Sequence, residues 1–110
     1  MTSYVLKINT EPEHYSKISN ILGVSPTNRK AFWEFSIDED NDLYTNSINW
    51  FMDLIELNFK NLKNLGIKKE QISLWFYKPY QGECSMEFSP EEMKRLSDNN
   101  ITLCISCWEL

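Results

Sequence analysis

Residues 43–66 read LYTNSINWFMDLIELNFKNLKNLG, and this stretch decides the fold. Large apolar side chains recur in it at steps of three and four residues, which places them on one face of an α-helix that ends at Gly66. The predicted buried face consists of Ile48, Phe51, Met52, Ile55, Phe59 and Leu62. Burying these side chains would contribute on the order of 10 kcal/mol before the loss of conformational entropy is counted. We therefore expect the rest of the chain to pack against this helix.

The same helix carries a second apolar ridge. Trp50, Leu54 and Leu57 lie on the side turned away from the first face, at 3.6 residues per turn. A helix that is apolar over so much of its circumference either packs on two sides or offers one side to a partner. The ridge is therefore a candidate binding surface unless other helices of the chain cover it.

Length, composition and charge limit the class of protein. A chain of 110 residues with 42% hydrophobic residues is long enough for one folded domain, residues 1–110. No membrane-spanning run or secretory signal is present in the sequence, so we expect a cytoplasmic protein. The net charge of -5 disfavours non-specific binding to nucleic acid or to anionic membranes. The adjacent basic pairs are predicted to be solvated surface; they are Arg29-Lys30, Lys68-Lys69 and Lys94-Arg95.

Alternating and helical patterns along the chain predict the element order β-α-β-α-β-β-α-β. The strands are expected at 3–9, 31–37, 71–77, 84–88 and 101–108. Two helices should begin with capping boxes, in which Thr10 pairs with Glu13 and Ser89 with Glu92. Pro79 and Gly82 favour a hairpin turn between the third and fourth strands.

This order predicts an α+β fold, a two-layer sandwich with about five strands and with the helices on one face, in a ferredoxin-like arrangement. The other face of the sheet would then lack helical cover. Trp75 and Tyr77 should point to that face, with Tyr80 close by. Exposed Trp and Tyr are the preferred anchors of protein interfaces. Alternatively, these aromatic side chains cover the sheet as a small packed layer or bury a homodimer interface.

No group of residues in the sequence matches a catalytic, cofactor or metal motif. Cys104 and Cys107 have C-x-x-C spacing, but residues three apart on a strand point to opposite faces. With Cys84 they make an odd count, which argues against a disulfide framework. His14 has no neighbouring nucleophile or carboxylate motif, and only three glycines are present, too few to suggest a phosphate loop. We therefore expect a protein that is not an enzyme and that needs no cofactor.

A cluster of acidic residues precedes the long helix. Asp38, Asp40 and Asp42 have the spacing that begins a calcium loop, but Leu43 replaces the required glycine and Asn49 the bidentate Glu. Together with Glu39, the cluster is better explained as a solvated turn that complements the helix dipole. The same carboxylates are a candidate landing site for a basic partner.

The chain resembles one family of small bacterial proteins, the domain of unknown function 4279 family. The residues that carry the resemblance are Ile21-Leu22-Gly23-Val24-Ser25-Pro26-Thr27, the Trp33 strand, the long helix with Leu62 near its end, and a last strand that closes on an aromatic residue. The chain departs from the family in its compact loop at residues 27–31 and in Cys107-Trp108-Glu109. The resemblance implies an α+β sandwich and supplies no catalytic residues.

The leading hypothesis is a non-catalytic protein-binding domain, specifically a bacterial immunity protein that occludes the active site of a toxin. Small size, acidity, surplus aromatic residues and the two-sided helix favour it. The partner would be a protein such as a basic toxin domain, and the chain itself a monomer or a homodimer. The alternative is a small-molecule-binding domain or an enzyme with a dispersed site, located between the sheet and the loop at residues 24–30.

Overall fold

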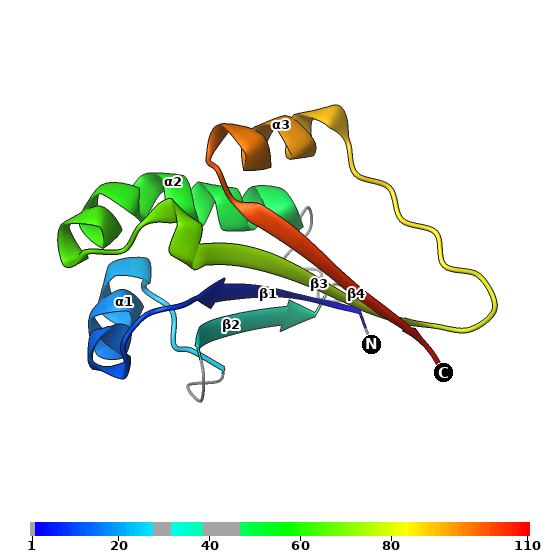
Figure 1. The fold of residues 1–110 in the computed structure, drawn as a ribbon, viewed down its shortest axis with the longest axis horizontal. Helices are drawn as coiled ribbons and strands as arrows, with labels where there is room; N and C mark the ends of the chain where they lie inside the picture. Colours follow the sequence, from blue (N-terminus) through cyan, green and yellow to red (C-terminus); the bar gives the residue numbers. More distant parts are fainter. Residues whose placement is uncertain (1, 28–31, 39–46) are drawn as a thin grey trace.

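A computed structural model describes residues 2–27, 32–38 and 47–110, and they form an α+β fold in two layers (Figure 1). The described strands are β1 (Ser3–Ile8), β2 (Trp33–Asp38), β3 (Ile72–Tyr80) and β4 (Thr102–Glu109). The α-helices are α1 (Tyr15–Leu22), α2 (Ser47–Leu65) and α3 (Pro90–Asp98). Two short 3₁₀ helices, η1 (Pro12–His14) and η3 (Lys69–Gln71), precede α1 and β3.

The strands form one sheet in the order β2-β1-β3-β4. β1 is antiparallel to both of its neighbours, whereas β3 and β4 are parallel. Parallel neighbours cannot be joined by a tight turn, and here α3 lies in the connection between them. A long extended segment, residues 81–89, leaves the end of β3 and curves back to α3 (yellow in Figure 1).

The predicted strand at residues 84–88 is wrong, and the described sheet has four strands instead of five. The alternation of apolar and polar residues there is real, but β3 already has β1 on one side and β4 on the other. The predicted hairpin at Lys78–Gly82 is wrong for the same reason, since β3 continues to Tyr80 alongside β4. The element order is β-α-β-α-β-α-β, which also differs from the expected ferredoxin-like arrangement.

The predicted core face of α2 is confirmed at five of its six positions: Ile48, Phe51, Met52, Ile55 and Leu62 are buried. Phe59 is half-buried. The residues 43–46 with which the predicted helix begins lie outside the described part of the chain. Although α2 is 19 residues long, none of the described helices combines the length and the apolar character that a membrane crossing requires.

All three helices cover the same face of the sheet. The core joins Leu6 and Ile8 of β1 and Leu74 of β3 to the apolar face of α2. Ile18 of α1 and Leu96 of α3 belong to the same buried cluster. Alternate residues of each strand therefore point toward the helices, and the residues between them point to the opposite face.

One predicted helix cap is confirmed and one is wrong. The Ser89 hydroxyl accepts a hydrogen bond from the Glu92 N–H, and the Glu92 carboxylate accepts one from the Ser89 N–H. At the first helix, Thr10 Oγ1 instead forms a 2.9 Å hydrogen bond with His14 Nδ1. The reason is that the chain enters this helix through the 3₁₀ turn at Pro12–His14, so α1 begins only at Tyr15.

Candidate functional site

The sheet face turned away from the helices, called the open face below, gathers aromatic and charged side chains. Its members follow from strand alternation and register. β3 supplies Ser73, Trp75 and Tyr77, and β1 supplies Ser3, Val5 and Lys7. The other open-face residues of the described strands are Glu34, Ser36 and Asp38 of β2, Pro79 of β3, and Thr102, Cys104, Ser106 and Trp108 of β4.

Lys7 is the central charged group of the open face. Its ammonium lies 4.1 Å from the centre of the Trp75 ring, 5.4 Å from that of Tyr77 and 5.7 Å from that of Phe32. A cation in such positions is attracted by the negative faces of the rings. Its Nζ also lies 3.8 Å from Glu34 Oε1, and the side chains are only 14% and 19% exposed. Lys7 therefore holds the aromatic rings and the neighbouring strand together.

Trp75 and Tyr77 form a packed pair instead of two separate side chains. Their ring centres are 5.9 Å apart and their planes differ by 15°, so the rings stack. The Trp75 indole donates a 3.0 Å hydrogen bond to Ser73 Oγ, which fixes the ring direction. Val5, directly opposite Trp75 in the register, is buried although it lies on the open face. The aromatic pair thus covers the centre of the sheet and keeps part of its own surface in solvent.

The open face also brings one acidic residue close to the aromatic pair. Ser3 lies between Asp38 of β2 and Tyr77 of β3 in the sheet register. Asp38 is exposed. It lies four residues after Glu34 on β2, so the two side chains point to the same face of the sheet. The other acidic candidates, Glu39, Asp40 and Asp42, lie outside the described residues.

Tyr80 does not belong to this group. It is opposite Glu109 in the β3–β4 register. Tyr80 lies four residues after Phe76 on the same strand, so both side chains point to the sheet face that carries the helices. Its carbonyl accepts a 2.9 Å hydrogen bond from the Leu110 N–H.

The three residues of the second apolar ridge of α2 differ in their burial. The Trp50 ring lies 6.0 Å from the Phe35 ring and 5.2 Å from the Phe51 ring, so it packs against the core. Leu54 is also partly buried against the core. Leu57, by contrast, is 83% exposed. The three residues therefore do not form one continuous apolar surface.

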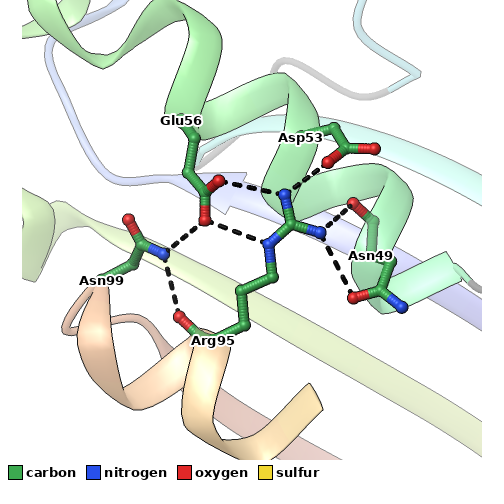
Figure 2. A network of polar contacts seen from close by, with 5 residues as sticks. All are labelled: Asn49, Asp53, Glu56, Arg95 and Asn99. Carbon is green, nitrogen blue, oxygen red and sulfur yellow. Dashed lines mark hydrogen bonds and ion pairs between the residues drawn. The ribbon is translucent and has the colours of Figure 1, made fainter. Parts of the chain in front are cut away.

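A polar network on another side of α2 binds α3 (Figure 2). The Arg95 guanidinium donates two 3.0 Å hydrogen bonds to the two carboxylate oxygens of Glu56, and it also bonds Asp53. Its third nitrogen donates to the backbone and side-chain oxygens of Asn49, both at 3.2 Å. Asn99 donates a further 2.8 Å bond to Glu56. Bidentate Arg–carboxylate pairs of this kind are strong and directional.

The ionisation of this network follows from the same contacts. The hydrogen bonds from Arg95 lower the pKa of Glu56, against the opposing effect of desolvation, and Asn99 adds to the lowering. The contacts with Glu56 and then Asp53 raise the pKa of Arg95. The expectation that the Lys94-Arg95 pair is merely solvated surface is wrong for Arg95. The spacing of Asn49, Asp53 and Glu56 on one helix face was the available sequence signal.

The described part of the chain also contains shallow hollows. One of about 460 Å³ lies at the end of α2, with Phe59 and Ile67 as its apolar lining and Lys63, Lys68 and Lys69 around them. The Lys69 ammonium lies 4.9 Å from the Phe59 ring centre. A second of the same volume lies between α1 and α2, lined by residues such as Asn20 and Asn61. The alternative hypothesis expected a site at the loop of residues 24–30. Neither hollow is lined by residues 24–27, and residues 28–30 lie outside the described part of the chain.

The comparisons with known proteins supply no relative. No protein-family model, no curated protein and no solved structure matches the chain. The resemblance to the domain of unknown function 4279 family therefore stays a hypothesis.

Proposed function

We propose that the chain is a non-catalytic protein-binding domain whose binding surface is the open face of the sheet. The observation that carries the proposal is the Trp75–Tyr77 stack, which is held rigidly by Lys7 and Ser73 but is only half-buried. Rigid, half-exposed aromatic side chains lose little entropy on binding and are typical hot spots of interfaces. The helices cover most of the other sheet face, although Ile105 of β4 is exposed there, so the open face is the natural choice.

The charges around the stack favour a basic partner. Glu34 and Asp38 lie on β2, on one side of the aromatic pair and separated from it by β1, and the whole chain carries a net charge of -5. Acidic groups at the edge of an apolar centre accelerate association with a positively charged protein and fix its orientation. We place Trp75 and Tyr77 at the centre of the interface and the carboxylates at its rim.

Within this class we favour a bacterial immunity protein that acts in the cytoplasm. The aromatic pair would enter the active-site cleft of a toxin, and the acidic rim would pair with its basic residues. Such an inhibitor needs neither a cofactor nor a catalytic group of its own, because it acts by occlusion. Membership of the domain of unknown function 4279 family is compatible with this proposal.

Affinity purification from the source organism tests the proposal. We expect the wild-type chain to retain one stoichiometric protein, and the double variant Trp75→Ala/Tyr77→Ala to bind it at least 30-fold more weakly, since hot-spot truncations typically cost about 2 kcal/mol or more. The purified partner should arrest bacterial growth, and co-expression of the wild-type chain should restore it. Mass spectrometry and a growth assay provide the two measurements.

Leu57→Ala is the matched control, because Leu57 is exposed but lies on α2, away from the open face. It should bind within about threefold of wild type, as expected for a residue outside the interface. Circular dichroism must show that the double variant is folded, since the pair also covers Val5. Equal binding by folded double variant and wild type, or recovery of no stoichiometric partner, would count against the proposal.

A second candidate, a small-molecule-binding domain, is favoured by the hollow at the end of α2. Three lysines against one glutamate, Glu70, around an apolar lining suit an anionic ligand with a hydrophobic part, such as an aromatic or short fatty carboxylate. A thermal-shift screen with benzoate and octanoate tests this. A true ligand at 100 times its dissociation constant should add about 2.7 kcal/mol of stability, and Lys68→Gln should weaken the effect. No shift with either compound would exclude this ligand class.

A further inference from the structure

Cys84 and Cys107 are far apart in the sequence but meet at one end of the sheet. Cys107 of β4 lies directly opposite Lys78 of β3 in the parallel register. The Lys78 ammonium donates a 2.6 Å hydrogen bond to the carbonyl of Ser85, the residue after Cys84. The same lysine therefore brings the 81–89 segment to the position of Cys107.

The Cys84 side chain also lies near enough to the Cys107 thiol to affect its ionisation. Partial desolvation and then the neighbouring Cys84 thiol raise the pKa of Cys107, while Lys78 opposes them. Both cysteines are free; Cys107 is exposed and Cys84 partly so. Reagents can therefore reach the pair from solvent.

Cys104 serves as an internal comparison. It is opposite Trp75 in the register, so it points to the open face, whereas Cys107 points to the other face with Lys78. Although Cys104 and Cys107 have the spacing of a redox motif, their side chains diverge. The C-x-x-C spacing therefore does not identify two neighbouring thiols. The thiol near Cys107 is that of Cys84, on the extended 81–89 segment.

We propose that Cys84 and Cys107 form a reversible intramolecular disulfide, made and broken by thiol–disulfide exchange, that fastens the 81–89 segment to β4. With glutathione disulfide as oxidant, the thiolate of one cysteine attacks a glutathione sulfur and releases one glutathione thiolate. The second cysteine thiolate then attacks the mixed disulfide and releases the other glutathione. Two protein thiols are oxidised, one small disulfide is reduced to two thiols, and the two protons that the protein thiols lose end on the two glutathione thiols.

The disulfide would close a ring that contains the whole of α3. In the reduced chain, the 81–89 segment is held by few contacts, such as the Lys78–Ser85 bond and the Phe76–Phe88 ring contact. A covalent link restricts the unfolded chain as well as this segment, so oxidation should stabilise the fold. Because the pKa of Cys107 is raised, little thiolate is present at neutral pH, and exchange should accelerate as the pH increases.

The test is incubation of the reduced, full-length chain with excess glutathione disulfide, followed by alkylation and peptide mass spectrometry. We expect a mass loss of about 2 Da, a Cys84–Cys107 cross-linked peptide, and alkylated Cys104. The melting temperature should increase by roughly 10 °C on oxidation. Cys104→Ser should behave like wild type, whereas Cys84→Ser should stop at a glutathione adduct and show no such increase.

Three outcomes would overturn the proposal. They are stable glutathione adducts on both Cys84 and Cys107, a cross-link to Cys104, and covalent dimers in place of the internal bond. Thiol alkylation gives a second readout that does not depend on stability. Excess glutathione should restore alkylation of both cysteines in the oxidised wild-type chain, and a failure to do so would contradict reversibility.

Discussion

Trp33→Ala is expected to lower the free energy of unfolding by about 3–5 kcal/mol, the upper part of the range for a single truncation in a protein core. Trp33 is fully buried at the start of β2, directly opposite Ile8 of β1. Its indole donates a 3.1 Å hydrogen bond to Ser19 Oγ, and that hydroxyl donates to the Tyr15 carbonyl. The substitution leaves a large cavity and breaks the link between sheet and α1. Urea unfolding followed by circular dichroism measures the loss.

Two variants separate the cavity from the hydrogen bond. Trp33→Phe keeps most of the ring volume and should cost only about 1–2 kcal/mol, chiefly the lost hydrogen bond and the remaining gap. Leu57→Ala, at an exposed site, should change stability by less than about 0.5 kcal/mol. A Trp33→Ala loss as small as that of Leu57→Ala would show that β2 does not pack on α1 as described.

Arg95→Ala is expected to lower the free energy of unfolding by about 2 kcal/mol, the second largest effect among the stability variants proposed. Exposed ion pairs contribute less than about 1 kcal/mol of stability, whereas removing one partner of a buried pair costs about 3–5 kcal/mol. The partly buried Arg95 lies between these two cases. The Arg95 side chain is 24% exposed and bonds three α2 residues at once (Figure 2). A nine-residue helix such as α3 is marginal by itself, so its attachment to α2 matters. Urea unfolding again gives the measurement.

Acid should remove part of this stabilisation. Arg95 lowers the pKa of Glu56 in the folded chain, so the contribution of this pair is fully present above the unfolded-state pKa of Glu56. It is lost as the pH falls through the lower, folded-state pKa, because the carboxyl group becomes neutral. The stability difference between wild type and Arg95→Ala should therefore be constant near pH 7 and shrink below about pH 4.

The adjacent residue provides the control for the arginine. Lys94 forms an ion pair with Asp98 within the same helix, and its side chain is 76% exposed. Lys94→Ala should cost no more than about 0.5 kcal/mol and show no comparable acid dependence. If Lys94→Ala and Arg95→Ala destabilise the chain equally, the α2–α3 network does not hold the helix in place.

The periodicity of α2 and of the strands predicted which side chains form the core. It succeeded because a buried face requires apolar residues at fixed intervals, as at Phe51 and Leu74. It failed at residues 84–88, where the same alternation occurs in an extended connection. A hairpin with β3 is impossible because β1 and β4 already lie on its two sides, and the segment does not pair with the outer edge of β4 either.

Long-range polar contacts were beyond sequence reasoning for a different reason. Arg95 and Glu56 are 39 residues apart, and only the packing of α3 on α2 brings them together. The same holds for Lys7 and Trp75, which meet because β1 and β3 are neighbours. Sequence predicted that Trp75 and Tyr77 share a face without helical cover. It could not predict that Lys7 is the cation that organises them.

The structure also changes the relative weight of the two predicted docking surfaces. The ridge on α2 loses continuity because Trp50 stacks on Phe35 and only Leu57 is strongly exposed. The open face is favoured as a binding surface because Asp38 lies on the same side of the sheet as Trp75 and Tyr77. A partner on the ridge would meet Leu57 beside the partly buried Trp50 and Leu54, whereas a partner on the open face would meet the stacked rings of Trp75 and Tyr77.

The most direct test uses the four tryptophan indoles as position markers in a two-dimensional ¹H–¹⁵N NMR spectrum. Trp33 reports on the core, Trp50 on α2, Trp75 on the centre of the open face and Trp108 on its edge, at the end of β4. On addition of the purified partner, we predict that the Trp75 indole signal shifts or broadens most while those of Trp33 and Trp50 keep their positions. A shift of Trp50 with an unchanged Trp75 would contradict the assignment of the open face as the binding surface.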